Sequence, residues 1–374
     1  MKSISNRNQW LDAWRAMAIL FVVACHGLVL SQWAWAATAE SVLGYFGVEI
    51  FFCLSGFLIG SIFLETTSRF TGNAGSLVVF EARRWFRTIP NYYFYILVNL
   101  FFTSLGWTFA KEPDLLRSMT FTQNLLWSPP AFFPESWSLA IEEIFYFILP
   151  ITFFVAWLIV RRPLRSLLLA LFVILFASMA LRLHGAHTAT LWDDGVRKVA
   201  LYRIDSLMWG VLLSVVYNKY LRTRKKAIAL VSIPLILLLS TSIYVVWQGK
   251  DWLDHSFYAK FWLFTVTSIG ICGLLLAGLS VRIPASLDAF FRPIARLSYS
   301  MYLSNLTSLY IVLHLLGRGD TLGGVALRIA VYLGIIFSMS AFTYRYIEKP
   351  FLRLRDTLFA VKPTDRRGVV PVSQ

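Results

Sequence analysis

Three polar residues near the start of the chain have types and spacing that suit acid–base chemistry. Asp12, Arg15 and His26 lie at the start of, or within, an apolar run that predicts a membrane helix over 13–33. Arg15 and His26 are separated by three helical turns plus about 20°, so both lie on one helix face, about 16 Å apart along the axis. Asp12 precedes Arg15 by one turn and can pair with it.

An imidazole within a membrane helix has two interpretations. It can make a hydrogen bond that packs helices together. It can also act as a general base, because its pKa lies close to physiological pH. Arg15 likewise can be an anchor at the cytoplasmic edge of the membrane or a group that orients a substrate. The residue types alone leave both alternatives open for His26 and for Arg15.

The next two apolar runs carry further ionisable residues. Glu49 lies inside the run over 45–64, where a carboxylate needs a partner or a water-filled cavity. Gly56 and Gly60 in the same run predict a close-packed helix face. Arg84 and Arg87 are one turn apart before the third run and can present two guanidinium groups to a phosphate. Positive-inside anchoring is the alternative for this pair.

Carboxylates also mark later helix ends. Glu142 and Glu143 are adjacent near the start of one run, and they face about 100° apart, so at most one of them shares a face with a given partner. Arg203 and Asp205 open another run and predict an ion pair at the membrane rim, for which a structural role is slightly favoured over a catalytic one. Glu348 follows the last run.

A metal site is not expected. His184, His187, Asp193 and Asp194 lie together in one predicted outer loop, but four such residues in a loop are weak evidence for metal binding. No phosphate-binding loop, serine-hydrolase elbow or zinc-protease motif is present. We therefore expect neither a metal nor a bound cofactor.

The elements that must position these residues are membrane helices. The chain is 57% hydrophobic and only 15% charged, whereas a soluble domain carries about a quarter charged residues. Its apolar residues gather in runs of roughly 18–22, long enough to cross about 30 Å of hydrocarbon. The sequence predicts an all-α, polytopic bundle of about ten spans, at 13–33, 45–64, 90–110, 139–160, 166–183, 203–218, 227–247, 260–280, 297–316 and 322–343.

The charge distribution fits a membrane protein better than a nucleic-acid-binding protein. The net charge is +15, but the basic residues are dispersed at the ends of apolar runs. With ten spans and a cytoplasmic N-terminus, most of the 35 Lys and Arg residues fall on the cytoplasmic side, as the positive-inside rule requires. Both termini are then cytoplasmic. We expect one transmembrane domain over 1–355 and a polar, disordered cytoplasmic tail over 356–374.

Together these residues resemble the acyltransferase-3 family of membrane acyltransferases over about residues 8–356. The resemblance rests on the order and spacing of several short motifs. They are Arg15-x10-His26, Phe-Phe-Cys-Leu-Ser-Gly-Phe-Leu in the second run, Arg84-x-x-Arg87 followed by Ile-Pro-x-Tyr-Tyr, Trp-Ser-Leu-x-x-Glu142-Glu143, Arg203-x-Asp205 and Glu348-Lys-Pro-Phe.

The resemblance implies a function in the cytoplasmic (inner) membrane. Members transfer an acyl group, typically acetyl from cytoplasmic acyl-CoA, to a hydroxyl of an envelope glycan, a lipid-linked sugar or a related acceptor. His26 becomes the leading catalytic candidate, as a base or as an acyl carrier, and Arg15 a group that orients the donor or balances Asp12.

The resemblance also assigns roles to the other candidates. Arg84 and Arg87 are expected to bind the phosphates of acyl-CoA. Glu142 or Glu143 is expected to tune His26 or to bind the sugar. Supporting roles fall to the remaining residues, which are Asp12, Glu49, Arg203, Asp205 and Glu348.

Two other functions compete with this interpretation. Polar groups on several spans could line the passage of a transporter or flippase for a polar glycan, although transporters often show two related halves and no such symmetry is visible. A non-catalytic membrane assembly subunit is the second, and it would not need His26 within a span. Acceptor identity, acyl length, oligomeric state, and direct transfer versus an acyl-enzyme intermediate stay open.

Overall fold

The expected all-α fold class is confirmed by the computed structural model, which describes residues 8–68, 70–108, 110, 114–222, 225–279, 281 and 283–359. Within these residues the extended backbone pairs at one isolated bridge, between Ser31 and Gly319. The helices are α1 (Gln9–Leu28), α2 (Ala36–Thr67), α3 (Gly75–Ser104), α4 (Leu115–Met119), α5 (Ser136–Val160), α6 (Pro163–Thr188), α7 (Asp205–Val216), α8 (Lys225–Trp247), α9 (Lys250–His255), α10 (Phe257–Phe261), α11 (Leu263–Gly278), α12 (Ala285–Leu316), α13 (Leu322–Thr343) and α14 (Lys349–Leu358).

Short helical turns of other pitch join some of these helices. Three are π-helical, namely η1 (Asp193–Arg197), η3 (Tyr217–Leu221) and η4 (Tyr344–Glu348), and η2 (Ala200–Tyr202) is a 3₁₀ turn. Because η4 continues α13 into α14, these three form one helix over Leu322–Leu358. The predicted domain boundary at 355 falls inside α14. Most of the predicted tail, from 360 to 374, lies outside the described residues.

The protein is a multi-pass membrane protein. In the described part of the chain, six helices are long and apolar enough to cross a bilayer: α1, α2, α5, α6, α8 and the continuous helix Leu322–Leu358. The other four expected spans coincide with α3, α7, α11 and α12. Of these, α7 has 12 residues and α11 has 16, whereas α3 and α12 carry several arginines. Length and composition thus do not establish the number ten.

Two helices begin well before the spans predicted for them. The third span was expected at 90–110, but α3 begins at Gly75 and contains Pro90. The ninth was expected at 297–316, but α12 begins at Ala285 and contains Pro293. In both, the first half is rich in charge, so a hydropathy pattern detects only the apolar half. The helical first half of α3 is what holds Arg84 and Arg87.

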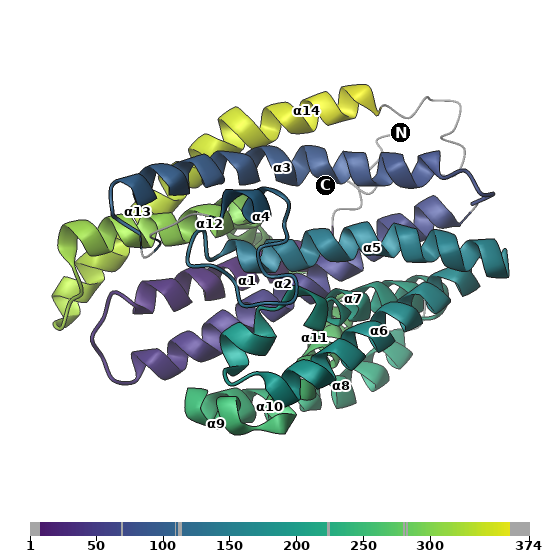
Figure 1. The fold of residues 1–374 in the computed structure, drawn as a ribbon, viewed down its shortest axis with the longest axis horizontal. Helices are drawn as coiled ribbons and strands as arrows, with labels where there is room; N and C mark the ends of the chain where they lie inside the picture. The colour runs from purple at the N-terminus through teal and green to yellow at the C-terminus, as the bar shows by residue number, and fades with distance from the viewer. Residues whose placement is uncertain are drawn as a thin grey trace.

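The helices form two groups on either side of a central pair (Figure 1). In Figure 1, α14 lies along α3 at one edge of the bundle, and α6 and α8 lie toward the opposite edge. Between them, α2 packs on both α1 and α7, and α1 also packs on α12. The helix α11 packs on α8 and α7. The N-terminal helices α1 and α2 therefore connect the α12–α13 group to the α7–α8–α11 group.

The contact between α2 and α7 is made by glycines, as the Gly56/Gly60 spacing predicted. A Cβ atom added to Gly56 would lie 2.1 Å from the Leu207 carbonyl oxygen, and one added to Gly60 would lie 2.8 Å from the Val211 Cα. From the other side, a Cβ on Gly210 would lie 2.2 Å from the Cys53 oxygen. The two backbones approach so closely that only hydrogen fits between them.

Replacement of Gly56 by Ala is expected to destabilise the protein, because the added methyl group meets backbone and cannot be relieved by a rotamer change. Overpacking costs about 1–3 kcal/mol, and a backbone clash lies at or above the upper end. The measurement is the thermal midpoint of the purified protein in detergent. Gly334→Ala is the matched control, because nothing lies within 4 Å of its added Cβ. Equal midpoints for the two variants would contradict this account of the α2–α7 contact.

Candidate functional site

Arg84 lies at the centre of a cluster of arginines and carboxylates. Its Nη2 atom donates to Glu143 Oε1 at 2.9 Å, and its guanidinium carbon lies 3.1 Å from the centre of the Tyr146 ring. Its Nη1 atom lies 3.9 Å from Glu81 Oε2. Glu142 is adjacent and has the Ser55 hydroxyl and the Arg84 charge as neighbours. Arg84 is therefore held in place by α5, and its charge is largely neutralised within the protein.

Arg87 belongs to the same cluster but is not paired. Its charge acts on Arg15, Glu142 and Glu348, yet among the described residues it has no hydrogen bond and no ion-pair partner within 4.0 Å. Its side chain is partly exposed. A second guanidinium, Arg15, is placed beside it by α1. A guanidinium that makes no ion pair within the protein leaves its N–H donors available to a bound anion.

Arg15 and Glu348, which lie near Arg87, are each held in place by a hydrogen-bonding partner. As predicted, Asp12 pairs with Arg15, at 3.3 Å. Glu348, in the π-helical turn η4, accepts a hydrogen bond from Ser300 at 3.1 Å, and Ser300 in turn accepts one from Asn91 at 3.0 Å. We call Arg15, Arg84, Arg87, Glu142, Glu143 and Glu348 the arginine–carboxylate cluster. It unites six of the residues singled out from the sequence, from α1, α3, α5 and η4.

His26 lies in the last turn of α1, three turns away from Arg15. The residue is partly exposed, but its Nδ1 atom is buried and has no hydrogen-bond partner among the described residues. The side chain of Asn305, on α12, lies beside the ring. Tyr332, on α13, packs against Gly27, the residue next to His26. The imidazole is thus held between helices by polar neighbours and retains an unsatisfied nitrogen.

Glu142 and Glu143 are assigned by the structure to the arginine–carboxylate cluster rather than to His26. The groups whose charge or hydrogen bonding reaches the His26 ring are Lys198, Arg197, Asn305 and the Val22 backbone. Tuning of His26 by either glutamate therefore has no contact to support it and stays a prediction. Arg15 is likewise distant from His26, and it joins the carboxylates.

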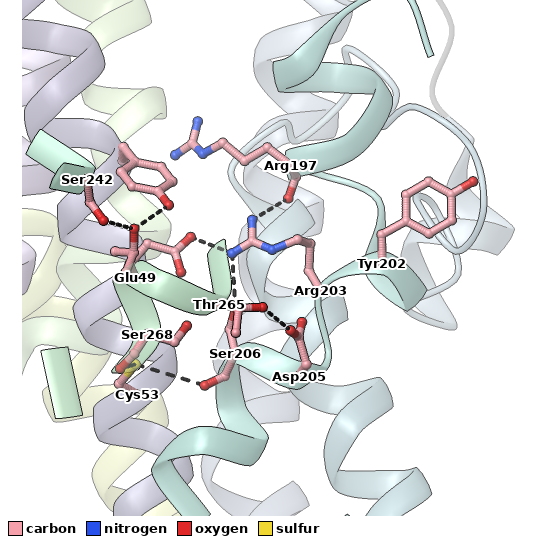
Figure 2. A network of polar contacts seen from close by, with 12 residues as sticks. Glu49, Cys53, Arg197, Tyr202, Arg203, Asp205, Ser206, Ser242, Thr265 and Ser268 are labelled. Carbon is pink, nitrogen blue, oxygen red and sulfur yellow. Dashed lines mark hydrogen bonds and ion pairs between the residues drawn. The ribbon is translucent and has the colours of Figure 1, made fainter. Parts of the chain in front are cut away.

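Glu49, Arg203 and Asp205 form a third group, deeply buried against α11 (Figure 2). Arg203 Nη2 pairs with Glu49 Oε1 at 2.5 Å, and the Arg203 guanidinium lies 3.8 Å from the centre of the Phe264 ring. Arg203 also donates to the Arg197 carbonyl oxygen at 3.0 Å and to Ser206 Oγ at 3.1 Å. The expectation that Glu49 needs a partner is confirmed.

The predicted ion pair between Arg203 and Asp205 is wrong. Asp205 accepts hydrogen bonds instead from Arg182 Nη1, at 2.8 and 3.0 Å. Arg182, Arg203 and Asp205 are each fully buried within the protein. The error arises because Asp205 starts α7 whereas Arg203 precedes it, so their side chains leave the chain in different directions. Each meets a partner from a helix distant in sequence.

Three further buried polar residues, Arg182, Asn305 and Glu135, were not singled out from the sequence as site residues. Arg182 lies in the apolar run of 166–183, and the rule that an ionisable residue in a membrane span is costly could have found it. Asn305 belongs to a polar strip along α12. Glu135 directly precedes the Trp-Ser-Leu motif and is almost completely buried; its position in a loop gave no signal of burial.

Of the four residues considered for metal binding, Asp193 and Asp194 are engaged in ion pairs, whereas His184 and His187 lie on α6 and not in the predicted loop. Asp193 lies 2.7 Å from Arg197 Nη1 and 2.7 Å from Lys198 Nζ, and Asp194 lies 2.7 Å from Lys198 Nζ. Burial acts to raise the pKa of Asp193, but the two cations outweigh it and hold the pKa well below its usual range. In the part of the chain that the structure describes, no three His, Cys, Asp or Glu side chains gather as metal ligands would.

Glu49→Gln is expected to destabilise the protein strongly, because it leaves Arg203 buried without a counter-charge. Removal of one partner of a buried pair costs about 3–5 kcal/mol. The measurement is the fraction of folded protein after a heating series in detergent. Asp114→Asn is the control, because its partner Arg117 and Asp114 are both about half exposed and such pairs contribute at most about 1 kcal/mol. Similar losses for both variants would show that the buried pair is not special.

Comparison with known proteins identifies relatives along the same chain. The model of an acyltransferase domain, that of the acyltransferase-3 family, matches residues 8–345. The O-acetyltransferase OatA of Staphylococcus aureus is 26% identical over 94% of this chain and 58% of its own length. The peptidoglycan O-acetyltransferase OatA of Listeria monocytogenes is 30% identical over 37% of this chain and 23% of its own length.

A third relative is the putative peptidoglycan O-acetyltransferase YrhL of Bacillus subtilis, 32% identical over 41% of this chain and 25% of its own length. The chain thus spans little more than half the length of the curated relative that it matches most extensively. No solved structure matches it. Because the family model matches residues 8–345, which is most of the chain, this protein belongs to the acyltransferase-3 family.

Proposed function

We propose that this protein is a membrane O-acyltransferase that moves an acetyl group from a cytoplasmic acetyl-CoA to a hydroxyl of a cell-envelope glycan. Family membership supports acyl transfer. Two relatives are named as peptidoglycan O-acetyltransferases, one of them as a putative one, and this supports peptidoglycan as the acceptor. The observation that carries the proposal concerns the two ends of α1. Near one end Arg87, which has no ion-pair partner among the described residues, lies beside Arg15, and at the other end the imidazole of His26 has an unsatisfied nitrogen.

The arginine–carboxylate cluster is the proposed donor site. Acyl-CoA carries phosphate groups, which suit guanidinium groups that are not neutralised internally. Arg87 meets that description, with Arg15 beside it, whereas Arg84 is engaged by Glu143 and Tyr146 and shapes the site. The thioester arm of the donor would extend from this site along α1 toward His26, about 16 Å away.

Ten spans with both termini in the cytoplasm would place this cluster on the cytoplasmic side, where acyl-CoA is available. The same arrangement in the cytoplasmic membrane would place the last turn of α1, with His26, toward the outer face. The positive-inside distribution of Lys and Arg supports this orientation. The donor and the glycan would then approach the imidazole from opposite sides.

His26 is the proposed general base. Its free nitrogen would accept the proton of the acceptor hydroxyl as the oxygen attacks the thioester carbonyl. The carbon–sulfur bond then breaks, and the coenzyme A thiolate leaves and takes up a proton. Attack by the imidazole itself, to give an acyl-histidine that the hydroxyl then resolves, uses the same nitrogen. Asn305 would fix the orientation of the ring in either case.

Glu49, Arg203 and Asp205 have a supporting role in this proposal. Their partners lie within the protein, so they hold α2, α6, α7 and α11 together instead of contacting substrate. Glu142 and Glu143 act through Arg84 on the donor side. None of the proposed steps requires a metal or a bound cofactor.

His26→Ala is expected to lower acetyl transfer by at least 10²–10⁴-fold, the usual contribution of a positioned base. Transfer is measured with radiolabelled acetyl-CoA and purified peptidoglycan fragments, using protein in detergent or in vesicles. His255→Ala is the control, because His255 lies on the short helix α9 and its Nδ1 contacts the Asp251 carbonyl oxygen. A His26→Ala variant that inserts normally and acetylates at the wild-type rate would refute the mechanism. Glycan transport without acetyl transfer by wild-type protein would favour a flippase instead.

Arg87→Gln is expected to raise the KM for acetyl-CoA about tenfold or more, because each lost contact of about 1.4 kcal/mol is a factor of ten. The fold should change little, since Arg87 has no partner among the described residues. Arg353→Gln removes the same charge from an exposed position of α14 and serves as the control. An Arg87→Gln variant with an unchanged KM for acetyl-CoA would remove Arg87 from the donor site.

A further inference from the structure

Glu135, which the sequence did not single out, differs from the buried carboxylates that it did single out. It precedes α5 and is 3% exposed. Neither of its carboxyl oxygens has a hydrogen-bond partner among the described residues. By contrast, Glu49 pairs with Arg203, Asp205 pairs with Arg182, and Glu348 accepts a bond from Ser300. A buried polar group without a partner is costly, so its retention requires an explanation.

In the described part of the chain, the surroundings of Glu135 contain hydroxyl groups and no cation that reaches its carboxyl group. Its own backbone carbonyl accepts a hydrogen bond from Tyr302 at 3.0 Å, and Tyr302 also contacts the Ser138 hydroxyl at 2.6 Å. A charge on Glu135 would act on five tyrosines from three helices, namely Tyr92 and Tyr95 of α3, Tyr302 and Tyr310 of α12, and Tyr332 of α13. The carboxyl group therefore lies where α3, α12 and α13 meet the start of α5.

Two contacts connect this place to His26. Tyr332, on which a charge at Glu135 would act, packs on Gly27 beside the imidazole, and its own hydroxyl is buried with no hydrogen-bond partner among the residues that the structure describes. Asn305, which lies beside the imidazole, donates its amide to the carbonyl oxygen of Tyr302 one turn earlier. The Oδ1 atom of Asn305 is also buried and unpaired. Unsatisfied polar atoms of His26, Asn305, Tyr332 and Glu135 thus border the same region.

We propose that Glu135 binds the acceptor, by accepting hydrogen bonds from sugar hydroxyls next to the hydroxyl that His26 deprotonates. A carboxylate offers two oxygens and about four acceptor positions, and the hydroxyls of a sugar ring are donors at matching spacing. Binding of a sugar would supply the partners that the folded protein lacks. This inference rests on the proposed function and adds the residue that recognises its acceptor. Glu135 carries no step of the acyl transfer itself.

Burial disfavours the charged form of Glu135 in the empty site, so hydrogen bonds donated by sugar hydroxyls would have to stabilise the carboxylate. Burial raises its pKa from 4.5 to about 8. Because the folded protein binds this proton more tightly than the unfolded chain, the free energy of unfolding falls as pH rises from about 4.5 to about 8. The titratable groups that face it are the five tyrosines, all of which are neutral in this range. Glu135→Gln removes this loss, so the variant should be at least as stable as wild type at pH 8.

The test compares Glu135→Gln, Glu135→Asp and the exposed control Glu65→Gln. The donor is acetyl-CoA, and the acceptor probe is the disaccharide of N-acetylglucosamine and N-acetylmuramic acid. We expect Glu135→Gln to raise the KM for the disaccharide at least tenfold, with the KM for acetyl-CoA and acceptor-free thioester hydrolysis within twofold of wild type. Glu135→Asp should recover part of the loss, and Glu65→Gln should match wild type.

Each other outcome overturns the inference. An unchanged KM for the disaccharide in Glu135→Gln, with wild-type transfer intact, removes Glu135 from the acceptor site and leaves the proposed function standing. A thermal midpoint lowered at pH 8, with donor and acceptor parameters lost together, assigns Glu135 a structural role. If wild-type protein transfers no acetyl group to any peptidoglycan-derived acceptor, the proposed function fails, and the acceptor role of Glu135 fails with it.

Discussion

The structure depends on the requirement that a charge removed from water must find a partner. Burial of an isolated ion within a membrane bundle is costly, and the protein meets this cost twice at its centre. Arg203 pairs with Glu49, and Arg182 pairs with Asp205. These four side chains come from α2, α6, the start of α7 and the turn before it, with Thr265 of α11 as a further contact. Figure 2 shows that most of this network surrounds the place where those elements meet. The pairs fix which helices can be neighbours.

Three polar groups discussed above do not meet this requirement within the protein. His26 Nδ1, the carboxyl oxygens of Glu135 and the guanidinium of Arg87 lack partners among the described residues. Other buried polar atoms in the described part of the chain also lack hydrogen-bond partners, both carboxyl oxygens of Glu81 among them. In the mechanism proposed above, these three groups would serve as an anion-binding group near one end of α1, and as a base and a hydrogen-bond acceptor near the other. An enzyme that joins a phosphorylated donor to a hydroxylated acceptor needs these three kinds of group.

The sequence predicted the helical class, the position of most helices and the small-residue contact of α2 with α7. It predicted the start of α3 and of α12 less well, because both helices begin in charged segments that a hydropathy pattern does not detect. Pairings between residues close in sequence, such as Asp12 with Arg15, could be predicted from helix geometry. Those of Arg203 and Asp205 could not, because their partners lie on α2 and α6. Glu135 was missed since its burial results from the meeting of four helices, which no local pattern records.

The position of His26 follows from the same close packing that holds the centre together. A Cβ atom on Gly44 would lie 2.7 Å from Cys25 Sγ, and one on Gly47 would lie 2.9 Å from Val22 Cγ2. The last turns of α1 are therefore pressed against the backbone of α2, which is itself fixed on α7 through Gly56. A catalytic group on such a rigid support keeps its geometry. Movement of α1 toward the donor would break these contacts. In the proposed mechanism the thioester would therefore have to reach the imidazole by the extension of its own flexible arm.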